Sequence, residues 1–463
     1  MSEHKFSSLD LHVDLLKNLD SLGYQTMTAV QAKSLPFVLE GRDVIAQAKT
    51  GSGKTAAFGL GLLQKLEVKR FRIQSLILCP TRELADQVAK EIRKLARGIH
   101  NIKVLTLCGG VPFGPQAGSL EHGAHIIVGT PGRIEDHLGR GTLKLNDVNM
   151  LILDEADRML DMGFQDAVDS IIDQIPGKRQ TLLFSATFPD QIESMINRVM
   201  NTPAMVKIEE VHDDTSIEQH FYPLPDNQYR FTALRLLLLY YSPGSTVIFC
   251  NTKKEAQNVA DKLNEYGFSA LALHGDLEQR DRDITLVRFS NKSISILVAT
   301  DVAARGLDID ELDAVINYHI AHDAEIHTHR IGRTGRAGRS GIACSLYTEN
   351  EGHKVAMLET TVDPVLDAEP LPPVALLDKH PIQPDMVTIR IDGGKKQKVR
   401  PGDILGALTG KKGIAGKQVG KINIFENWAY VAVNQKVAKP ALHKLMHGKL
   451  KGRTFRARLL EDN

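Results

Sequence analysis

The sequence predicts an α/β protein with two successive parallel-sheet domains, followed by a smaller α+β domain. Short apolar runs without polar alternation indicate strands covered on both faces, and amphipathic helical stretches separate these runs. This pattern occurs twice along the chain and ends at a proline-rich break, after which a basic region follows. At 463 residues the chain is also too long for a single core, so three domains are expected.

The first domain is predicted at residues 1–205. Its strands are expected at residues 43–47, 75–79, 125–129, 150–154 and 181–185. Residues 83–96 place Leu84, Val88, Ile92 and Leu95 on one helical face. Because strands that alternate with helices usually form a parallel sheet, this order favours one sheet with helices on its faces.

A linker is predicted at residues 206–219, and a second domain of the same kind at residues 220–360. The strands of this domain are expected at residues 246–250, 270–274, 296–300, 314–318 and 343–347. A helix is expected at residues 254–267. The repeated order indicates a second parallel sheet.

Residues 361–385 are predicted to form a linker with extended stretches. Six prolines between positions 364 and 384 are too many for a helix or an interior strand. The last domain, residues 386–463, shows six apparent elements in the order β-α-β-β-α-β. This order suggests a fold like that of an RNA-recognition motif.

Positive charge is concentrated in this last domain. Residues 384–463 hold 17 Lys and Arg against 6 Asp and Glu, whereas the whole chain has a net charge of only +1. Such an asymmetry is typical of a region that binds a polyanion. A basic module that only keeps the protein soluble is the alternative, and composition does not separate the two.

The remaining composition indicates a cytoplasmic protein. The N-terminus lacks the pattern of a signal peptide, and no apolar run reaches the roughly 18 residues of a membrane span. Four widely spaced cysteines without a CxxC pair indicate buried thiols in a reducing compartment. We expect a cytoplasmic monomer without membrane contact.

The stretch AKTGSGKT lies between a predicted strand and a predicted helix. Glycines in such a loop let backbone N–H groups approach phosphate oxygens, and the helix directs its positive end at them. Lys54 is predicted to reach the β- and γ-phosphates, and the Thr55 hydroxyl to bind Mg²⁺. The predicted nucleotide-binding loop consists of Ala48, Lys49, Thr50, Gly51, Ser52, Gly53, Lys54 and Thr55, where Ala48 replaces the usual glycine.

Acidic and basic groups further along the chain complete a candidate site for nucleotide hydrolysis. Asp154 follows a predicted strand and is expected to hold Mg²⁺ together with Thr55. Glu155 is placed to orient or deprotonate the attacking water. Residues 329–339 hold four arginines, which can stabilise charge on the γ-phosphate. Because these arginines lie in a different domain from the loop, domain closure is expected to complete the site.

The chain resembles the DEAD-box RNA helicase family over about its first 350 residues. The motif DEAD stands at residues 154–157. Further matches, in the order of the family, are GYQTMTAVQ (23–31), PTREL (80–84), GG (109–110), TPGR (130–133), SAT (185–187), FCNT (249–252), QRDR (279–282) and ATDVAARGLD (299–308). The resemblance implies two RecA-like P-loop domains, ATP and Mg²⁺ as cofactors, and RNA as the partner.

The resemblance also implies roles for individual residues. The catalytic residues would be Lys54, Asp154, Glu155, His329, Arg333 and Arg336, the last two as arginine fingers. Phe6 and Gln31 would contact adenine, and Asp308 the ribose. The RNA side of the two lobes would consist of Thr81, Arg82, Gly109, Gly110, Thr130, Pro131, Gly132, Arg133, Gln279, Arg282, Thr300 and Asp301.

The last domain is expected to bind folded RNA mainly through charge. Residues 427–434 meet the usual RNP1 pattern poorly, so only Tyr430 and Trp428 offer aromatic surface. The candidates for RNA contact are Lys395, Lys396, Lys398, Arg400, Lys411, Lys412, Lys449, Lys451 and Arg453, with Arg456 as an extension. Residues 392–410 resemble the tail of bacterial family members, which implies recognition of a hairpin in large-subunit ribosomal RNA and a role in ribosome assembly.

Two other classes of function remain open from the sequence. A non-enzymatic RNA-binding clamp would use ATP only to lock, although Glu155, Arg333 and Arg336 favour hydrolysis. A DNA helicase with a similar core would lack the 2′-hydroxyl contacts that distinguish RNA from DNA. For the RNA helicase, core contacts to phosphate and ribose carry little sequence information. The basic domain is therefore predicted to select the RNA, and the linker to raise the local concentration of nearby duplexes.

Overall fold

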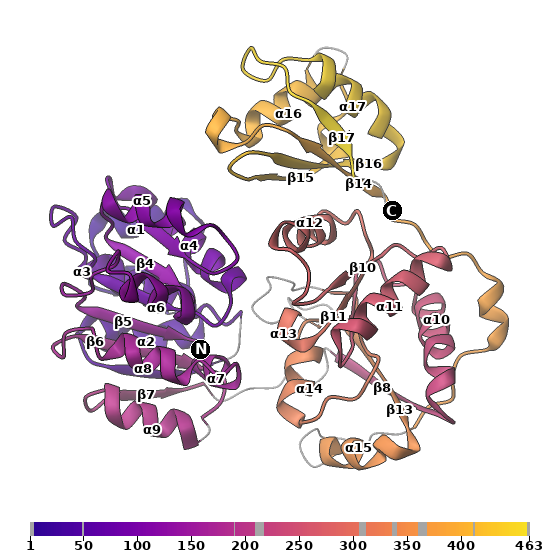
Figure 1. The fold of residues 1–463 in the computed structure, drawn as a ribbon, viewed down its shortest axis with the longest axis horizontal. Coiled ribbons are helices and arrows are strands. Elements are labelled where there is room, and N and C mark those ends of the chain that lie inside the picture. Colours follow the sequence, from indigo (N-terminus) through magenta and orange to yellow (C-terminus); the bar gives the residue numbers. More distant parts are fainter. Residues whose placement is uncertain are drawn as a thin grey trace. The chain divides into compact units, whose positions relative to one another are not determined.

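A computed structural model describes residues 4–48, 51–188, 190–208, 217–304, 312–335, 340–359, 368–410 and 413–460. These residues divide into two compact units, the first ending at residue 208 and the second beginning at residue 217. Figure 1 shows the ribbon coloured along the chain. Among the described residues, no helix is both long and apolar enough to cross a membrane.

The first unit is built on a parallel sheet whose described strands follow the order β3-β4-β2-β5-β6-β1-β7. The strands are β1 (Val44–Gln47), β2 (Ser75–Leu78), β3 (Val104–Leu107), β4 (Ile126–Gly129), β5 (Met150–Asp154), β6 (Gln180–Ser185) and β7 (Ala204–Lys207). Val44 and Ala46 of β1 enter one hydrophobic cluster, and Ile45 enters another. Apolar residues therefore cover both faces of the sheet, as the continuous apolar runs predict.

Helices connect the strands of this unit. They are α1 (Val13–Ser21), α2 (Ala29–Leu39), α3 (Lys54–Lys65), α4 (Arg82–Leu95), α5 (Phe113–Glu121), α6 (Pro131–Gly139), α7 (Ala156–Asp161), α8 (Gln165–Ile172) and α9 (Asp190–Val199). Thr81 caps α4, because its side chain accepts a hydrogen bond from the Leu84 amide at 3.2 Å. Arg93 and Lys94 lie in the last turn of α4, where positive charge complements the helix dipole.

The sequence pattern does not predict strands β3, β7 and β8 (Ile217–Leu224). In β7, which lies at an edge of the sheet, buried Ala204 and Val206 alternate with exposed Met205 and Lys207. Such a strand has no continuous apolar run. Strands β7 and β8 also extend into the predicted linker at residues 206–219, of which residues 209–216 lie outside the described residues.

The second unit contains another parallel sheet, with described strands in the order β10-β11-β9-β12-β13-β8. The strands that follow β8 are β9 (Thr246–Phe249), β10 (Ala270–Leu273), β11 (Ile296–Ala299), β12 (Ala314–Asn317) and β13 (Gly341–Thr348). The helices are α10 (Arg230–Tyr241), α11 (Lys253–Glu265), α12 (Gln279–Ser290), α13 (Asp301–Ala304), α14 (Ala324–Ile331) and α15 (Gly352–Glu359). The predicted fold class of two tandem parallel-sheet domains is confirmed.

The proline-rich segment at residues 368–384, here called the strap, packs against this second lobe. Its backbone pairs with β8 through a hydrogen bond from the Glu369 amide to the Phe221 carbonyl at 2.8 Å. Leu371, Leu376 and Leu377 of the strap pack against the hydrophobic core of the lobe. The described part of the expected linker is therefore a docked segment and not a free tether.

The C-terminal domain has an antiparallel sheet in the order β15-β16-β14-β17. Its elements are β14 (Met386–Ile391), α16 (Pro401–Thr409), β15 (Val419–Ile424), β16 (Ala429–Asn434), α17 (Ala438–His447) and β17 (Ala457–Leu459), which confirms the predicted order. Ile389 and Val431 face the core shared with α16 and α17. On the other face, Thr388 is bonded to the side chains of Asn291 at 3.1 Å and Ser293 at 2.7 Å in the loop after α12.

His327 of α14 is a buried histidine in the second lobe. Its side chain is 1% exposed, its Nε2 lies 3.1 Å from Gln219 Oε1, and its ring stacks on Phe221 with centroids 6.0 Å apart. Burial, followed by the nearby charge of Arg330, lowers the pKa of His327 to about 4. The native fold therefore holds this histidine neutral at pH 7.

We predict that acidification destabilises the second lobe through His327. The unfolded chain takes up the proton near pH 6.5, whereas the folded lobe does so only near pH 4. The contribution of neutral His327 to the free energy of unfolding is thus complete above pH 6.5. This contribution is lost as the pH falls towards 4, and the loss is about 3 kcal/mol at most. Hydrogen exchange of the β12 and β13 amides at pH 5 and 7 measures this loss, which His327→Gln should reduce. Equal pH dependence in both proteins would contradict the prediction.

Candidate functional site

The order of the first sheet brings three predicted motifs to one edge. Strands β5, β6 and β1 are neighbours, and their carboxyl ends lead into residues 154–157, 185–187 and 48–55 respectively. The carboxyl ends of parallel strands are where α/β sheets bind ligands. The nucleotide-binding loop, the acidic motif and the SAT motif are therefore adjacent because of topology.

The described part of the nucleotide-binding loop has the features that a phosphate-binding loop requires. Gly53 has a left-handed φ of 94°, and a Cβ there would lie 2.5 Å from the Gln31 amide nitrogen, so that only glycine fits. Lys54 begins α3, is 6% exposed, and donates from Nζ to the Ala48 carbonyl at 3.0 Å. The ammonium group is thus held over the loop. Lys49 and Thr50 lie outside the described residues.

The two residues expected at the adenine are held inside the first lobe. Gln31 donates to the Gly53 carbonyl at 3.1 Å and accepts from the Thr28 amide at 2.9 Å, so that it ties α2 to the loop. Phe6 is 3% exposed and belongs to the hydrophobic core, with its ring centroid 6.4 Å from that of Tyr24. In this conformation Phe6 presents little ring surface for stacking.

Asp154 and Glu155 form the acidic part of the site at the end of β5. Burial raises the pKa of Asp154 to about 6, while the nearby Lys54 opposes this shift. Among the described residues, Asp154 Oδ1 is buried without a hydrogen-bond partner, as expected of an oxygen that would coordinate a cation. Glu155 has a left-handed φ of 52°, a strained conformation for a residue with a side chain.

Asp157, the last residue of the acidic motif, joins this motif to the SAT motif. Its Oδ2 accepts hydrogen bonds from the amides of Ala186 and Thr187, each at 3.1 Å, and from the Thr187 hydroxyl at 3.1 Å. The Asp157 amide in turn donates to the Ser185 hydroxyl at 3.3 Å. Asp157 is missing from the predicted site residues, although the acidic quartet that contains it could have pointed to it.

The predicted RNA side of the first lobe follows strands β2, β3 and β4. Thr81 and Arg82 follow β2, Gly109 and Gly110 follow β3, and Thr130, Pro131, Gly132 and Arg133 follow β4. Arg133 donates from both terminal nitrogens to the Val111 carbonyl at 3.1 Å, which joins the last two groups. Phe113 supports this junction, because its ring stacks on that of buried His137 with the ring centroids 4.2 Å apart. No local pattern in the sequence points to Phe113 or His137.

In the second lobe, Arg330 bonds to Asp301, one of the predicted residues, and to two residues at the end of β12. It is 2% exposed and donates to both carboxylate oxygens of Asp301 at 2.6 and 2.8 Å. It also donates to Asn317 Oδ1 at 3.0 Å and to the His319 carbonyl at 2.8 Å. Asp301, expected on the RNA side, is therefore engaged in an internal ion pair that joins α13 to α14.

The remaining predictions in this lobe fall partly within the described residues. Thr300 precedes α13, His329 lies on α14, and Arg333 follows α14, with its carbonyl accepting from the Leu312 amide at 3.2 Å. Gln279 begins α12, and Arg282 on the same helix donates to the His274 carbonyl at 3.3 Å. Asp308 and Arg336 lie outside the described residues.

In the C-terminal domain, two groups of predicted basic residues lie at one end of the sheet. The amides of Lys395 and Lys396 donate to the carbonyls of Phe425 and Glu426 in the β15–β16 turn, at 2.8 and 2.9 Å. Lys451 Nζ donates to the Lys398 carbonyl at 3.0 Å, so that the second group adjoins the first. These groups contain Lys395, Lys396, Lys398 and Arg400, and Lys449, Lys451 and Arg453. Lys411 and Lys412 lie outside the described residues.

The two aromatic candidates of this domain do not form an open stacking platform. Tyr430 is fully buried, and Trp428 has the guanidinium groups of Arg390 and Arg280 at 5.2 and 6.0 Å from its ring centroid. Arg280 belongs to α12 of the second lobe. The sheet face that carries Tyr430 is therefore covered, which agrees with binding through charge instead of base stacking.

We predict that Asp157→Asn impairs strand separation more than nucleotide binding. Asparagine lacks the charge that strengthens the bonds to Ala186 and Thr187, so the two motifs are coupled less firmly. Unwinding of a short RNA duplex should fall about tenfold, while binding of a fluorescent ATP analogue stays within about twofold. Asp161→Asn, which weakens the pair that the exposed Asp161 makes with Arg158 on α7, is the matched control. Equal losses of binding and unwinding would contradict this role.

Comparison with known proteins agrees with this geometry. The family model "DEAD/DEAH box helicase" matches residues 28–195, and "Helicase conserved C-terminal domain" matches residues 229–338. A third model, "DbpA RNA binding domain", matches residues 388–459. The three matches fall on the first lobe, the second lobe and the C-terminal domain in turn.

Individual relatives extend this result along most of the chain. "ATP-dependent RNA helicase DbpA" of Escherichia coli is 54% identical over 96% of this chain and 97% of its own length. "DEAD-box ATP-dependent RNA helicase CshA" of Bacillus subtilis is 42% identical over 78% and 73%. The solved structure of Dbp5 from S. cerevisiae, bound to RNA and ADP BeF3, is 30% identical over 80% of this chain and 95% of its own, with a TM-score of 0.72. The chain belongs to the family of DEAD-box ATP-dependent RNA helicases.

Proposed function

We propose that RNA-stimulated ATP hydrolysis drives local opening of short RNA duplexes, which the C-terminal domain selects by binding a hairpin of large-subunit ribosomal RNA. The protein then acts as a cytoplasmic monomer in assembly of the large ribosomal subunit. The observation that carries this proposal is the basic end of the C-terminal domain, in the region that matches an RNA-binding domain family. The relative with the same domain order is an ATP-dependent RNA helicase.

The first lobe supplies most of the groups that this hydrolysis needs. Lys54 would contact the β- and γ-phosphates. Thr55 and Asp154 Oδ1, which has no hydrogen-bond partner in the described part of the chain, would hold Mg²⁺, whose charge stabilises the transferring phosphoryl group. Glu155 would orient the attacking water. Arg333 and Arg336 of the second lobe would complete the site when RNA favours closure of the lobes.

The targeting role follows from the features of RNA that each surface can recognise. Contacts of the two lobes to phosphate and ribose accept almost any RNA, so the selection of a substrate must come from elsewhere. The C-terminal domain offers charge at one end of its sheet, and its described residues form no exposed aromatic face. A folded hairpin, which displays a dense array of phosphates, fits such a surface better than an unstacked strand.

We predict that Glu155→Gln abolishes turnover but not binding. Glutamine keeps the shape of the side chain and cannot deprotonate the water, so RNA-stimulated phosphate release should fall at least about 100-fold. Glu193→Gln, an exposed change on α9, should leave this rate unaltered. Absence of steady phosphate release in the unmodified protein, even with saturating RNA, would instead favour the ATP-locked clamp.

We predict that the double variant Lys395→Ala/Lys396→Ala loses affinity for a large-subunit rRNA hairpin. Removing two phosphate contacts should weaken binding about tenfold or more and reduce its salt dependence. Lys436→Ala/Lys439→Ala removes the same charge beyond the other end of β16 and serves as the matched control. ATPase activity with a high concentration of generic RNA should persist even when residues 386–463 are deleted. Equal preference for ribosomal RNA with and without these residues would refute the targeting role.

A further inference from the structure

A histidine that belongs to none of the predicted sites lies between two carboxylates of the second lobe. His319 follows β12, and its side chain is 16% exposed. Its Nε2 lies 2.7 Å from Glu255 Oε1 in the first turn of α11. Its Nδ1 lies 3.6 Å from Oε1 of Glu351, which stands just before α15. One imidazole ring therefore joins three separate segments of the lobe.

The contacts of this ring require that it carries a positive charge. A carboxylate only accepts hydrogen bonds, so each ring nitrogen that faces one must carry a hydrogen, and an imidazole with both hydrogens is a cation. Burial and the nearby Arg230 act to lower the pKa of His319. The hydrogen bonds with Glu255 and Glu351 outweigh them, so this pKa lies above its ordinary value of 6.5.

Glu351 is the fixed side of this arrangement. Arg230 of α10 is 1% exposed, and its Nη2 lies 2.5 Å from Glu351 Oε2. Thr348 donates to the same oxygen from its amide at 3.0 Å and from its hydroxyl at 3.2 Å. The side chain of Glu255 is more exposed, at 28%. The contact of the ring with Glu255 is therefore the one that a small movement of α11 would alter.

The backbone of His319 is tied to the helix that leads to the proposed arginine fingers. Arg330 of α14 donates to the His319 carbonyl at 2.8 Å while it binds both carboxylate oxygens of Asp301. Helix α14 carries His329 and is followed directly by the segment with Arg333. Because consecutive backbone bonds make a helix rigid, a shift of the His319 backbone changes where Arg333 lies.

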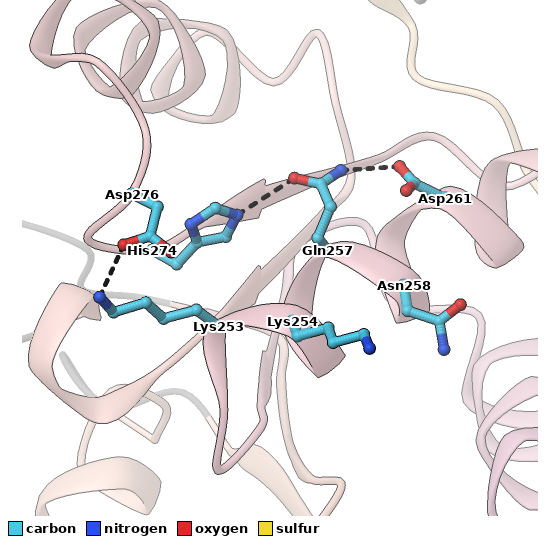
Figure 2. Close-up of a pocket in the computed structure, with 7 residues that line it drawn as sticks. All are labelled: Lys253, Lys254, Gln257, Asn258, Asp261, His274 and Asp276. Atoms are coloured by element: carbon cyan, nitrogen blue, oxygen red, sulfur yellow. Dashed lines mark hydrogen bonds and ion pairs between the residues drawn. The ribbon is translucent and has the colours of Figure 1, made fainter.

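The first turn of α11, which carries Glu255, is linked to the predicted RNA contacts on α12. In this turn Lys253 Nζ lies 2.6 Å from Asp276 Oδ1, in the segment that follows β10 (Figure 2). Arg282 of α12, a predicted RNA contact, donates to the His274 carbonyl in the same segment at 3.3 Å. A series of polar contacts thus leads from α12 through α11 to the imidazole ring.

We propose that His319 is a positioning residue, which couples RNA binding on the second lobe to the placement of Arg333 at the nucleotide. The inference rests on the proposed RNA-stimulated hydrolysis of ATP. RNA on α12 fixes the first turn of α11, the ion pair of Glu255 with the imidazolium fixes the connection before α14, and Arg330 holds that connection to the helix. A charge-assisted hydrogen bond suits this task, because it is strong and directional where little water competes.

The test measures the factor by which a non-hydrolysable ATP analogue tightens the binding of a single-stranded RNA, by fluorescence anisotropy at pH 7. This factor is the coupling between the two ligands. In His319→Ala it should fall about three- to tenfold, while RNA affinity without nucleotide stays within about twofold. His322→Ala, which removes a histidine with a 67% exposed side chain from the same connection, is the matched control.

The pH dependence of this factor distinguishes coupling from a merely structural role. In the unmodified protein the factor should fall as the pH rises through the pKa of His319, above 6.5, because the neutral ring cannot donate to both carboxylates. His319→Lys keeps its positive charge up to about pH 10, so it should show no such fall. Glu255→Gln removes one of the charges that raise the pKa, so the fall should begin at a lower pH.

The outcomes that count against the inference differ from those that count against the proposed function. An equal coupling factor in the unmodified protein and in His319→Ala would overturn the inference alone, provided that RNA stimulates phosphate release by the unmodified protein. The same pH dependence in the unmodified protein and in His319→Lys would also overturn it, because another group would then be titrating. Absence of RNA-stimulated phosphate release by the unmodified protein would overturn the proposed function and the inference together.

Discussion

The carboxylate of Asp157 joins the two loops on which the nucleotide site of the first lobe depends. It holds the amides of Ala186 and Thr187 after β6 while it belongs to the motif after β5, and it is nearly fully buried. Charge-assisted bonds in such a place are strong because water does not compete for the donors. The second lobe has a similar tie, since Arg330 binds both oxygens of Asp301. A buried carboxylate in the first lobe, and a buried guanidinium group in the second, therefore each connect two neighbouring motifs.

The features that the sequence predicts well are those that depend on local chemistry. Strands β1, β5 and β6 show as continuous apolar runs because both faces of their sheet are covered. The loop that ends at Lys54 is apparent because a phosphate-binding turn needs glycine at positions such as Gly53, where any side chain would collide with Gln31. Asp154 is also predictable from local sequence, because it is a carboxylate that stands at the end of a continuous apolar strand.

The features that the sequence does not predict depend on packing between distant segments. Asp301 and Arg330 are 29 positions apart, and nothing local indicates that they form an ion pair. Tyr430 reads as an exposed aromatic residue of an RNA-binding sheet, yet that sheet face packs on α12 and its loop. The strap reads as a linker because prolines exclude regular structure, but prolines do not prevent an extended segment from docking on a lobe.

The docking of the strap affects where the second lobe can be divided from the rest of the chain. Leu371, Leu376 and Leu377 complete its core, and His220 and Tyr222 of β8 both bond to the Glu369 carboxylate, at 2.7 and 3.3 Å. A fragment that stops before residue 368 would uncover this apolar groove and leave polar groups unpaired beside it, a combination that promotes aggregation. The natural boundary of the lobe for biochemical work thus lies after Pro384, even though the helicase motifs end well before it.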